Sequence, residues 1–206
     1  MAVKSKVTTP LRKETYKSLQ LNAGVLLVGL DLSQYQNASA LKAALATEIS
    51  GGTKLLGATR GGGSFTITRD IRQVDADGVR SAFVGSEIVD SADAYLSTTI
   101  IEITPSHIKT ILGNADIDNS SANHIIVTVR MAIEEEDYID SLVWVGDTSE
   151  GFMAIELLNA FNTADFSFTF ADKNEGTATA EFHAHQEDVN SNDSIPCNLH
   201  WFTDAT

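Results

Sequence analysis

Alternation of apolar and polar residues runs through much of the chain and predicts a protein made mainly of β-strands. In the segment 65–72, apolar side chains alternate with polar or charged ones. A period of two is typical of a strand with one buried face. The segments 123–133 and 166–170 alternate in the same way, so each is expected to be a strand with its apolar residues on one face. Further strands are expected at 21–31, 94–104, 141–147, 176–186 and 195–202.

One segment departs from this alternation. Residues 151–161 are mostly apolar on both faces, as is typical of a strand that is covered on both sides. This segment is therefore expected to be either a central strand or a strand in an interface.

Two short stretches have the signals of helices. The first spans 39–49, where Ser39 is the expected N-cap and Gly51 ends the helix. The second opens at Thr104-Pro105, a capping residue followed by proline in the first turn, and runs to Gly113. Leu41, Leu45 and Ile49 recur at helical spacing and should form one apolar stripe.

Several strands with two short helices predict two packed antiparallel sheets, a β-sandwich or barrel, with one or two flanking helices. A chain of 206 residues is long enough for one domain with a proper core. Residues 1–20 are polar and basic and are expected to form an N-terminal arm. Residues 21–206 are expected to form the single domain.

Charge is distributed unevenly along the chain. Residues 1–130 carry 13 basic and 12 acidic residues, whereas residues 131–206 carry 16 acidic residues and only Lys173 as a base. Binding to the phosphate backbone of DNA requires cationic side chains. We therefore expect no tight binding to DNA. An acidic surface could line a path along which DNA slides, or it could simply keep the protein soluble.

Nothing in the sequence predicts a membrane segment, because no apolar run approaches the roughly 20 residues of a membrane helix. The first residues carry no apolar block of a secretory signal, so we expect the protein to stay in the cell that makes it. Cys197 is the only cysteine, which fits a reducing compartment. It is expected to be a small buried or strand residue rather than a nucleophile.

One group of residues could hold a metal. Glu181, His183 and His185 alternate in a predicted strand and so share one face, and two histidines with a carboxylate can bind zinc. The alternative is a solvated polar face, which we favour. The acidic run Glu134–Asp137 lacks the spacing of a calcium loop and is expected to be solvated. No catalytic residues and no cofactor are predicted.

Several blocks, in this order along the chain, resemble the major tail tube proteins of phages and prophages with long, non-contractile tails. The resemblance runs collinearly from about Leu21 to the C-terminus, and no single block is a catalytic motif. The blocks are Leu21-Asn22-Ala23-Gly24, Gly57 to Phe65, Asp77 to Arg80 with Gly85, Ile101 to Pro105 with Leu112-Gly113, Asp137 to Asp140, Trp144 to Asp147, Asn159 to Thr163 and Asp172 to Thr177.

The resemblance implies a structural virion protein of the tail-tube fold that is not an enzyme. Six subunits would form a ring whose inner wall is a continuous β-barrel, and rings would stack through a long loop and terminal arms. The tube would be assembled in the host cytoplasm around a tape-measure protein, and it would contact terminator and baseplate proteins at its ends. It would later conduct DNA without specific binding. The long loop is expected at 51–63 or at 75–89.

Two hypotheses follow for particular residues. The basic arm of one subunit is expected to lie on the acidic back half of a neighbour, and part of the acidic surplus is expected to face the lumen. The arm residues are Lys4, Lys6, Arg12, Lys13 and Lys17, and the candidates for the lumen are Asp165, Asp172, Glu175 and Glu181.

Three other interpretations are open at this stage. One is the inner tube of a contractile tail, a phage-derived bacteriocin or an injection system, which a neighbouring sheath gene would favour. Another is a carbohydrate-binding β-sandwich, which would normally be exported. The third, and least favoured, is a zinc enzyme that uses His183 and His185.

Overall fold

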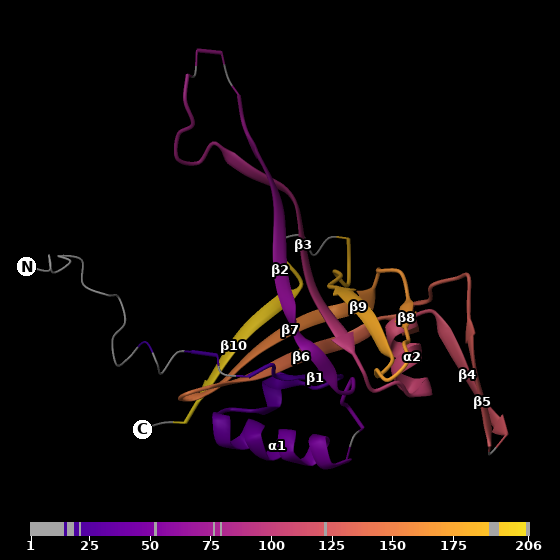
Figure 1. Cartoon of the computed structure of the whole chain (residues 1–206). Helices are drawn as coiled ribbons and strands as arrows, with labels where there is room; N and C mark the ends of the chain where they lie inside the picture. The colour runs from indigo at the N-terminus through magenta and orange to yellow at the C-terminus, as the bar shows by residue number, and fades with distance from the viewer. Residues whose placement is uncertain are drawn as a thin grey trace, which may run out of the picture.

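The computed structural model of this chain describes residues 15, 19–20, 22–51, 53–75, 77–78, 80–121, 123–189 and 194–204. These residues form mainly β-structure with two α-helices (Figure 1). The elements in chain order are β1 (Val25–Val28), η2 (Leu32–Gln34), α1 (Ala38–Gly51), β2 (Thr59–Gln73), β3 (Glu87–Ile100), α2 (Pro105–Leu112), β4 (Ala115–Ser121), β5 (His124–Val129), η3 (Glu135–Asp137), β6 (Ile139–Thr148), β7 (Gly151–Asn162), β8 (Ser167–Thr169), β9 (Thr177–His183) and β10 (Cys197–Thr203).

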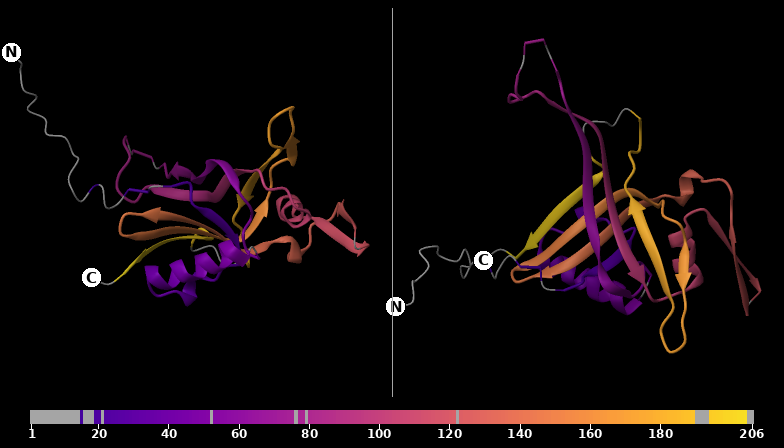
Figure 2. Two further views of the ribbon diagram at one scale, coloured as in Figure 1. Left: turned by 60° about the horizontal axis from the view of Figure 1, so that its bottom comes forward. Right: turned by 45° about the horizontal axis from the view of Figure 1, so that its top comes forward.

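Eight strands form one antiparallel sheet that folds into two halves. One half has the order β1-β6-β7-β10, and the other has the order β2-β3-β9-β8. The halves are joined where the end of β7 pairs with β9, at Phe161↔His183 and Asn162↔Phe182. Figure 2 shows the two halves from two further sides. The predicted mainly β class is confirmed, with the two packed sheets present as halves of one continuous sheet.

The main core lies between these halves. Leu142 and Leu157 from one half meet Leu96, Ala180 and Phe182 from the other, and all five are buried. Phe182 is the largest fully buried side chain. Burial of such side chains is the dominant favourable contribution to folding.

Strand β7 is the centre of the fold. It pairs with β6 along one side, and with β10 and then β9 along the other. One of its faces contributes Leu157 to the core between the halves, while Ala154 lies in a second core beneath α1. This position explains why the segment 151–161 is apolar on both faces, and it settles the sequence alternatives in favour of a central strand.

Helix α1 covers the outer face of the half β1-β6-β7-β10. Leu41 and Leu45 are buried there against Leu27 and Val143, whereas Ile49, the third residue of the predicted stripe, is 55% exposed. The expected N-cap is wrong by two residues: the Asn37 side chain accepts from the Ala40 amide at 2.8 Å. Ser39 instead donates from its amide and its hydroxyl to the Asp204 carboxylate, at 2.9 and 2.8 Å.

Helix α2 has the ends that the sequence predicted. The Thr104 hydroxyl accepts from the His107 amide at 3.2 Å, and Pro105 occupies the first turn. Gly113 ends the helix at φ +72°, and a Cβ there would lie 2.3 Å from the Phe161 ring. Both the backbone conformation and the close contact therefore require glycine.

A long hairpin made of β2 and β3 projects from the rest of the molecule (Figure 1). A strand of 15 residues spans about 50 Å at about 3.3 Å per residue. The tip contains the expected turn at Asp77-Gly78 and lies between Val74 and Ser86. Of the two predicted positions for the long loop, the structure therefore favours 75–89, and the segment 51–63 instead leads from α1 into the base of the hairpin.

A second, shorter hairpin is made of β4 and β5 and forms a separate two-stranded sheet. Its base is fixed by Arg130, which forms ion pairs with Asp116 at 3.2 Å, with Glu134 at 2.9 Å and with Asp137. The Asp137 side chain is only 3% exposed. The expectation that the run Glu134–Asp137 is merely solvated is therefore wrong, because one of its carboxylates is buried against the only nearby guanidinium among the described residues.

Two of the predicted one-sided apolar stripes are exposed in the single chain. In and beside β5, Ile125, Val129 and Met131 are exposed, and Met131 reaches 102%. Beside and within β8, Phe168 is 42% and Phe170 78% exposed. Period-two alternation predicted the strands correctly, but no described segment of the chain covers these apolar side chains.

Candidate functional site

The most distinctive surface is the outward face of the half β2-β3-β9-β8. Along β3 and β9, buried and partly exposed residues alternate, so the outward side chains can be identified from the register of the strands. From Asp93 to Ile100 and along β9, every one of them is polar and none is lysine or arginine, while Arg60 lies at the rim of this face. This polar face consists of Ser64, Thr66, Thr68, Asp93, Tyr95, Ser97, Thr99, Ser167, Thr169, Thr179, Glu181 and His183.

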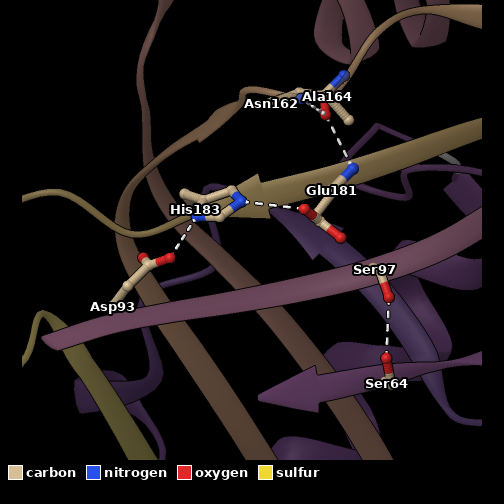
Figure 3. Close-up of polar contacts among 7 residues, drawn as sticks. All are labelled: Ser64, Asp93, Ser97, Asn162, Ala164, Glu181 and His183. Atoms are coloured by element: carbon tan, nitrogen blue, oxygen red, sulfur yellow. Dashed lines mark hydrogen bonds and ion pairs between the residues drawn. The ribbon is translucent and has the colours of Figure 1, made fainter. Parts of the chain in front are cut away.

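His183 is the centre of a network on the polar face (Figure 3). Its Nδ1 lies 2.8 Å from the Asp93 carboxylate and its Nε2 lies 3.2 Å from the Glu181 carboxylate. The ring stacks on Tyr95 with the ring centroids 5.0 Å apart. Side chains from β3 and β9 are thus tied together across the face, and one hydroxyl contact, Ser64 to Ser97 at 2.8 Å, ties β2 to β3.

This network does not form a metal site. Asp93 and Glu181 approach opposite nitrogens of the His183 ring, so one ion could not contact all three groups. His185 lies elsewhere, with its Nδ1 3.1 Å from the Asn159 carbonyl and its ring against Tyr138. Within the described residues no group of three or more histidine, cysteine or acidic side chains could hold a metal.

Asn162 holds the corner between β7 and the polar face, and sequence reasoning missed it. Its Oδ1 accepts from the amides of Glu181 at 2.8 Å and Ala164 at 3.3 Å, and its Nδ2 donates to the Ile111 carbonyl at 2.6 Å. The side chain is buried, and buried polar groups are stable only when they are hydrogen-bonded. An asparagine after an apolar strand gives no signal in the sequence that distinguishes it from a turn residue.

The half β2-β3-β9-β8 ends in two open edges. Among the described strands β2 pairs only with β3, and β8 pairs only with β9. An edge strand presents unpaired amide and carbonyl groups, which are a template for pairing with another chain. Gly61 and Gly62, both at positive φ, interrupt the register near the start of β2.

The four acidic residues proposed for the lumen lie in different surroundings. Glu181 belongs to the polar face, whereas Asp165 and Asp172 are exposed in the segments before and after β8. Glu175 forms an ion pair with Arg60. The pKa of the Glu175 carboxyl lies below its ordinary value because its own backbone amide and the Arg60 guanidinium both donate to it. The structure brings Glu181 into a network and leaves the other three apart.

The basic residues predicted for the N-terminal arm lie outside the part of the chain that the structure describes. They are Lys4, Lys6, Arg12, Lys13 and Lys17.

Cys197 is half-buried at the start of β10, and burial raises the pKa of its thiol. A thiol with a raised pKa is a poor nucleophile at neutral pH.

The chain has two tryptophans, Trp144 and Trp201. Trp144 packs against the main core and donates from its indole to the Ala23 carbonyl at 2.9 Å, whereas Trp201 is exposed. No helix among the described residues is long and apolar enough to cross a membrane.

Comparison with known proteins gives similarity only at the level of structure. No family model matches the chain, and no curated protein sequence matches it. A chain in the virion of a native gene transfer agent particle is similar at 10% identity and a TM-score of 0.37, over 78% of this chain and 91% of that one. A chain in the tail of an empty gene transfer agent particle, with C6 symmetry, is similar at 9% identity and a TM-score of 0.38, over 88% and 96%.

Proposed function

We propose that this chain is the major tail tube subunit of a phage or prophage with a long, non-contractile tail, and that it acts as a structural protein without catalysis. The collinear sequence blocks support this function. The structural observation that carries it is a four-stranded half-sheet with one wholly polar face and two open edges. Six copies form a ring, rings stack into a tube, and the tube belongs to the virion tail.

The two open edge strands each have polar side chains on the polar face and aromatic side chains on the opposite face. On β8, Ser167 lies on the polar face and Phe168 on the other face. On β2, Ser64 lies on the polar face and Phe65 on the other. When β8 of one copy pairs with β2 of the next, polar side chains continue along one side of the joined sheet and aromatic side chains along the other.

Closure of such a sheet into a ring explains the exposed apolar residues. A head-to-tail contact repeated around a rotation axis closes a ring, and a closed barrel has no free edges. Phe168, which is exposed in a single copy, is then covered by the neighbouring β2. The ring thus supplies the core that the stripe in 166–170 lacks within one chain.

The polar face lines the bore of this tube. It carries Asp93 and Glu181, and Arg60 at its rim is paired with Glu175. Because no unpaired cation lies among the described side chains of this face, little release of counterions favours DNA binding, so DNA passes along hydroxyls and carboxylates without adhering. Asp165 and Asp172 add negative charge near this face, whereas the charge of Glu175, the third candidate, is balanced by Arg60. The tape-measure protein occupies the same bore before DNA does. Terminator and baseplate proteins are the expected partners at the ends of the tube.

The basic arm, residues 1–20, joins neighbouring subunits. An extended arm of 20 residues reaches at most ~70 Å, which is enough to cross to another subunit. Its charge is opposite to that of residues 131–206, and complementary charge favours the choice of partner and the rate of association.

Electron microscopy of the concentrated, purified protein tests the function directly. We expect hollow tubes with six-fold symmetry at low salt, and the protein without residues 1–20 is expected to require a higher concentration to form them. A protein that stays monomeric under all conditions would contradict the proposed function. A truncated protein that polymerises normally at low and high salt would contradict only the role of the arm. A tube whose inner wall is basic would contradict the role of the polar face.

A further inference from the structure

We propose that a groove beside α1 is the receptor for the tip of the β2–β3 hairpin of a second copy. This inference rests on the proposed function and goes further, because it identifies where the stacking contact lies on the neighbouring subunit. The α1 groove has a volume of about 550 Å³. Its apolar lining consists of Val25, Leu45, Ala46, Ile49, Val145 and Phe152.

The tip of the hairpin has the chemistry of a ligand for this groove. Val74, Phe83 and Val84 are exposed at the tip, and Val84 is 102% exposed. The described part of the chain offers them no apolar surface to cover them. An exposed apolar patch of this kind marks a surface for association.

The two surfaces lie at opposite ends of the molecule. The hairpin tip is at the top of Figure 1 and α1 is at the bottom, and the right-hand view of Figure 2 shows the same separation. A copy placed beyond the tip in the same orientation therefore presents its α1 end to that tip. Such a head-to-tail contact does not close on itself and instead extends along an axis.

Both surfaces carry charges of both signs, and Lys42 is the cation that could meet a carboxylate of the tip, while Asp147 on the same groove accepts from Asn22. Lys42 lines the α1 groove and forms no salt bridge with any other described residue. The tip carries Asp75 and Asp77 together with Arg80, all exposed, and the two carboxylates are the groups that Lys42 could pair with. Opposite charges at the rim of an apolar contact favour one orientation of the partner and faster association.

Disulfide trapping in assembled protein tests this contact. In a Cys197→Ser background, Val84→Cys and Ile49→Cys are introduced together, and assembled protein is oxidised with oxidised glutathione. Each chain then carries both halves of the contact, so non-reducing gel electrophoresis should show a ladder beyond the dimer. Each single-cysteine protein should give at most a dimer. A matched control pairs Val84→Cys with Met131→Cys, because Met131 is as exposed as Val84.

A charge exchange tests the same contact without a covalent bond. Lys42→Glu should raise the concentration needed for stacking by about twofold to fivefold, in line with the small energies of surface ion pairs. Addition of Asp77→Lys to Lys42→Glu should return this concentration to that of the unsubstituted protein.

The outcomes separate the two proposals. If tubes form but the test pair gives no more ladder than the control pair and the charge exchange restores nothing, the α1 groove is not the receptor, and the tube function stands. If neither tubes nor ladders form, both proposals are wrong.

Discussion

Two regions of this molecule contain the same kinds of residues in the same alternating pattern, yet only one of them is buried. Along β9, apolar and polar residues alternate, and Phe182 is fully buried between the two halves of the sheet. Along β8, Phe168 is 42% exposed, although its neighbours alternate just as regularly. The difference teaches that alternation reports that a face will be covered, but not whether the same chain or another copy covers it.

The comparison divides the apolar residues by their expected effects. Residues of the main core between the halves, such as Phe182 and Leu157, should determine whether the subunit folds. Residues of β8 and of the hairpin tip should leave the folded subunit unchanged and determine whether it assembles. Measurements of unfolding and of assembly on the same variants can separate these effects.

The largest effect is expected for Leu157→Ala. Removal of a fully buried leucine side chain leaves a cavity between the halves and should lower the free energy of unfolding by about 2–5 kcal/mol. Chemical denaturation measures this change. Leu199→Ala, at a partly exposed position on β10, is the control and should have a much smaller effect. Equal effects at the two positions would show that the core is not where the structure places it.

A smaller loss of stability is expected for Asn162→Ala. The substitution leaves the amides of Glu181 and Ala164 and the Ile111 carbonyl without their partner. Unpaired buried polar groups should lower the free energy of unfolding by about 1–3 kcal/mol. Asn174→Ala, in an exposed turn, is the matched control. A stable Asn162→Ala protein would mean that water or a rearranged backbone replaces these bonds.

The smallest effect on stability, and the sharpest contrast, is expected for Phe168→Lys. Because the side chain is on an open edge, the free energy of unfolding of the monomer should change by no more than about 0.5 kcal/mol. Tube formation, followed by light scattering and microscopy, should nevertheless be lost. Thr128→Lys, at an exposed position on β5, adds the same charge and should assemble. Normal tubes from Phe168→Lys would remove β8 from the interface.

Local signals in the sequence predicted the elements that depend on local chemistry. Thr104, Pro105 and Gly113 were sufficient to define α2, because a cap, a first-turn proline and a left-handed glycine act within a few residues. The N-cap of α1 was misplaced at Ser39 because Asn37 competes for the same role and Asp204, distant in sequence, binds Ser39.

Features that depend on the topology could not be predicted in this way. The polar face exists only because β2, β3, β9 and β8 lie side by side. The order of these strands cannot be predicted from the sequence of any one of them. The partners of His183 illustrate this point: Glu181 is visible two residues away, whereas Asp93 reaches it from β3. The separation of His183 from His185 likewise follows from the end of β9, which spacing alone did not reveal.

The backbone pairing of the long hairpin, which is irregular at Thr59/Gly63 and at Asp70/Ile71, has a mechanical consequence. Backbone pairing between β2 and β3 extends from Thr59↔Ile100 to Gln73↔Glu87, so the tip is held by a stiff ribbon and not by a slack linker. Two bodies joined through a stiff ribbon keep a constant spacing, whereas a flexible connection permits a range of spacings. Assemblies built by repetition of this contact would therefore lengthen by the same distance with each added layer. Their total length would be proportional to the number of layers.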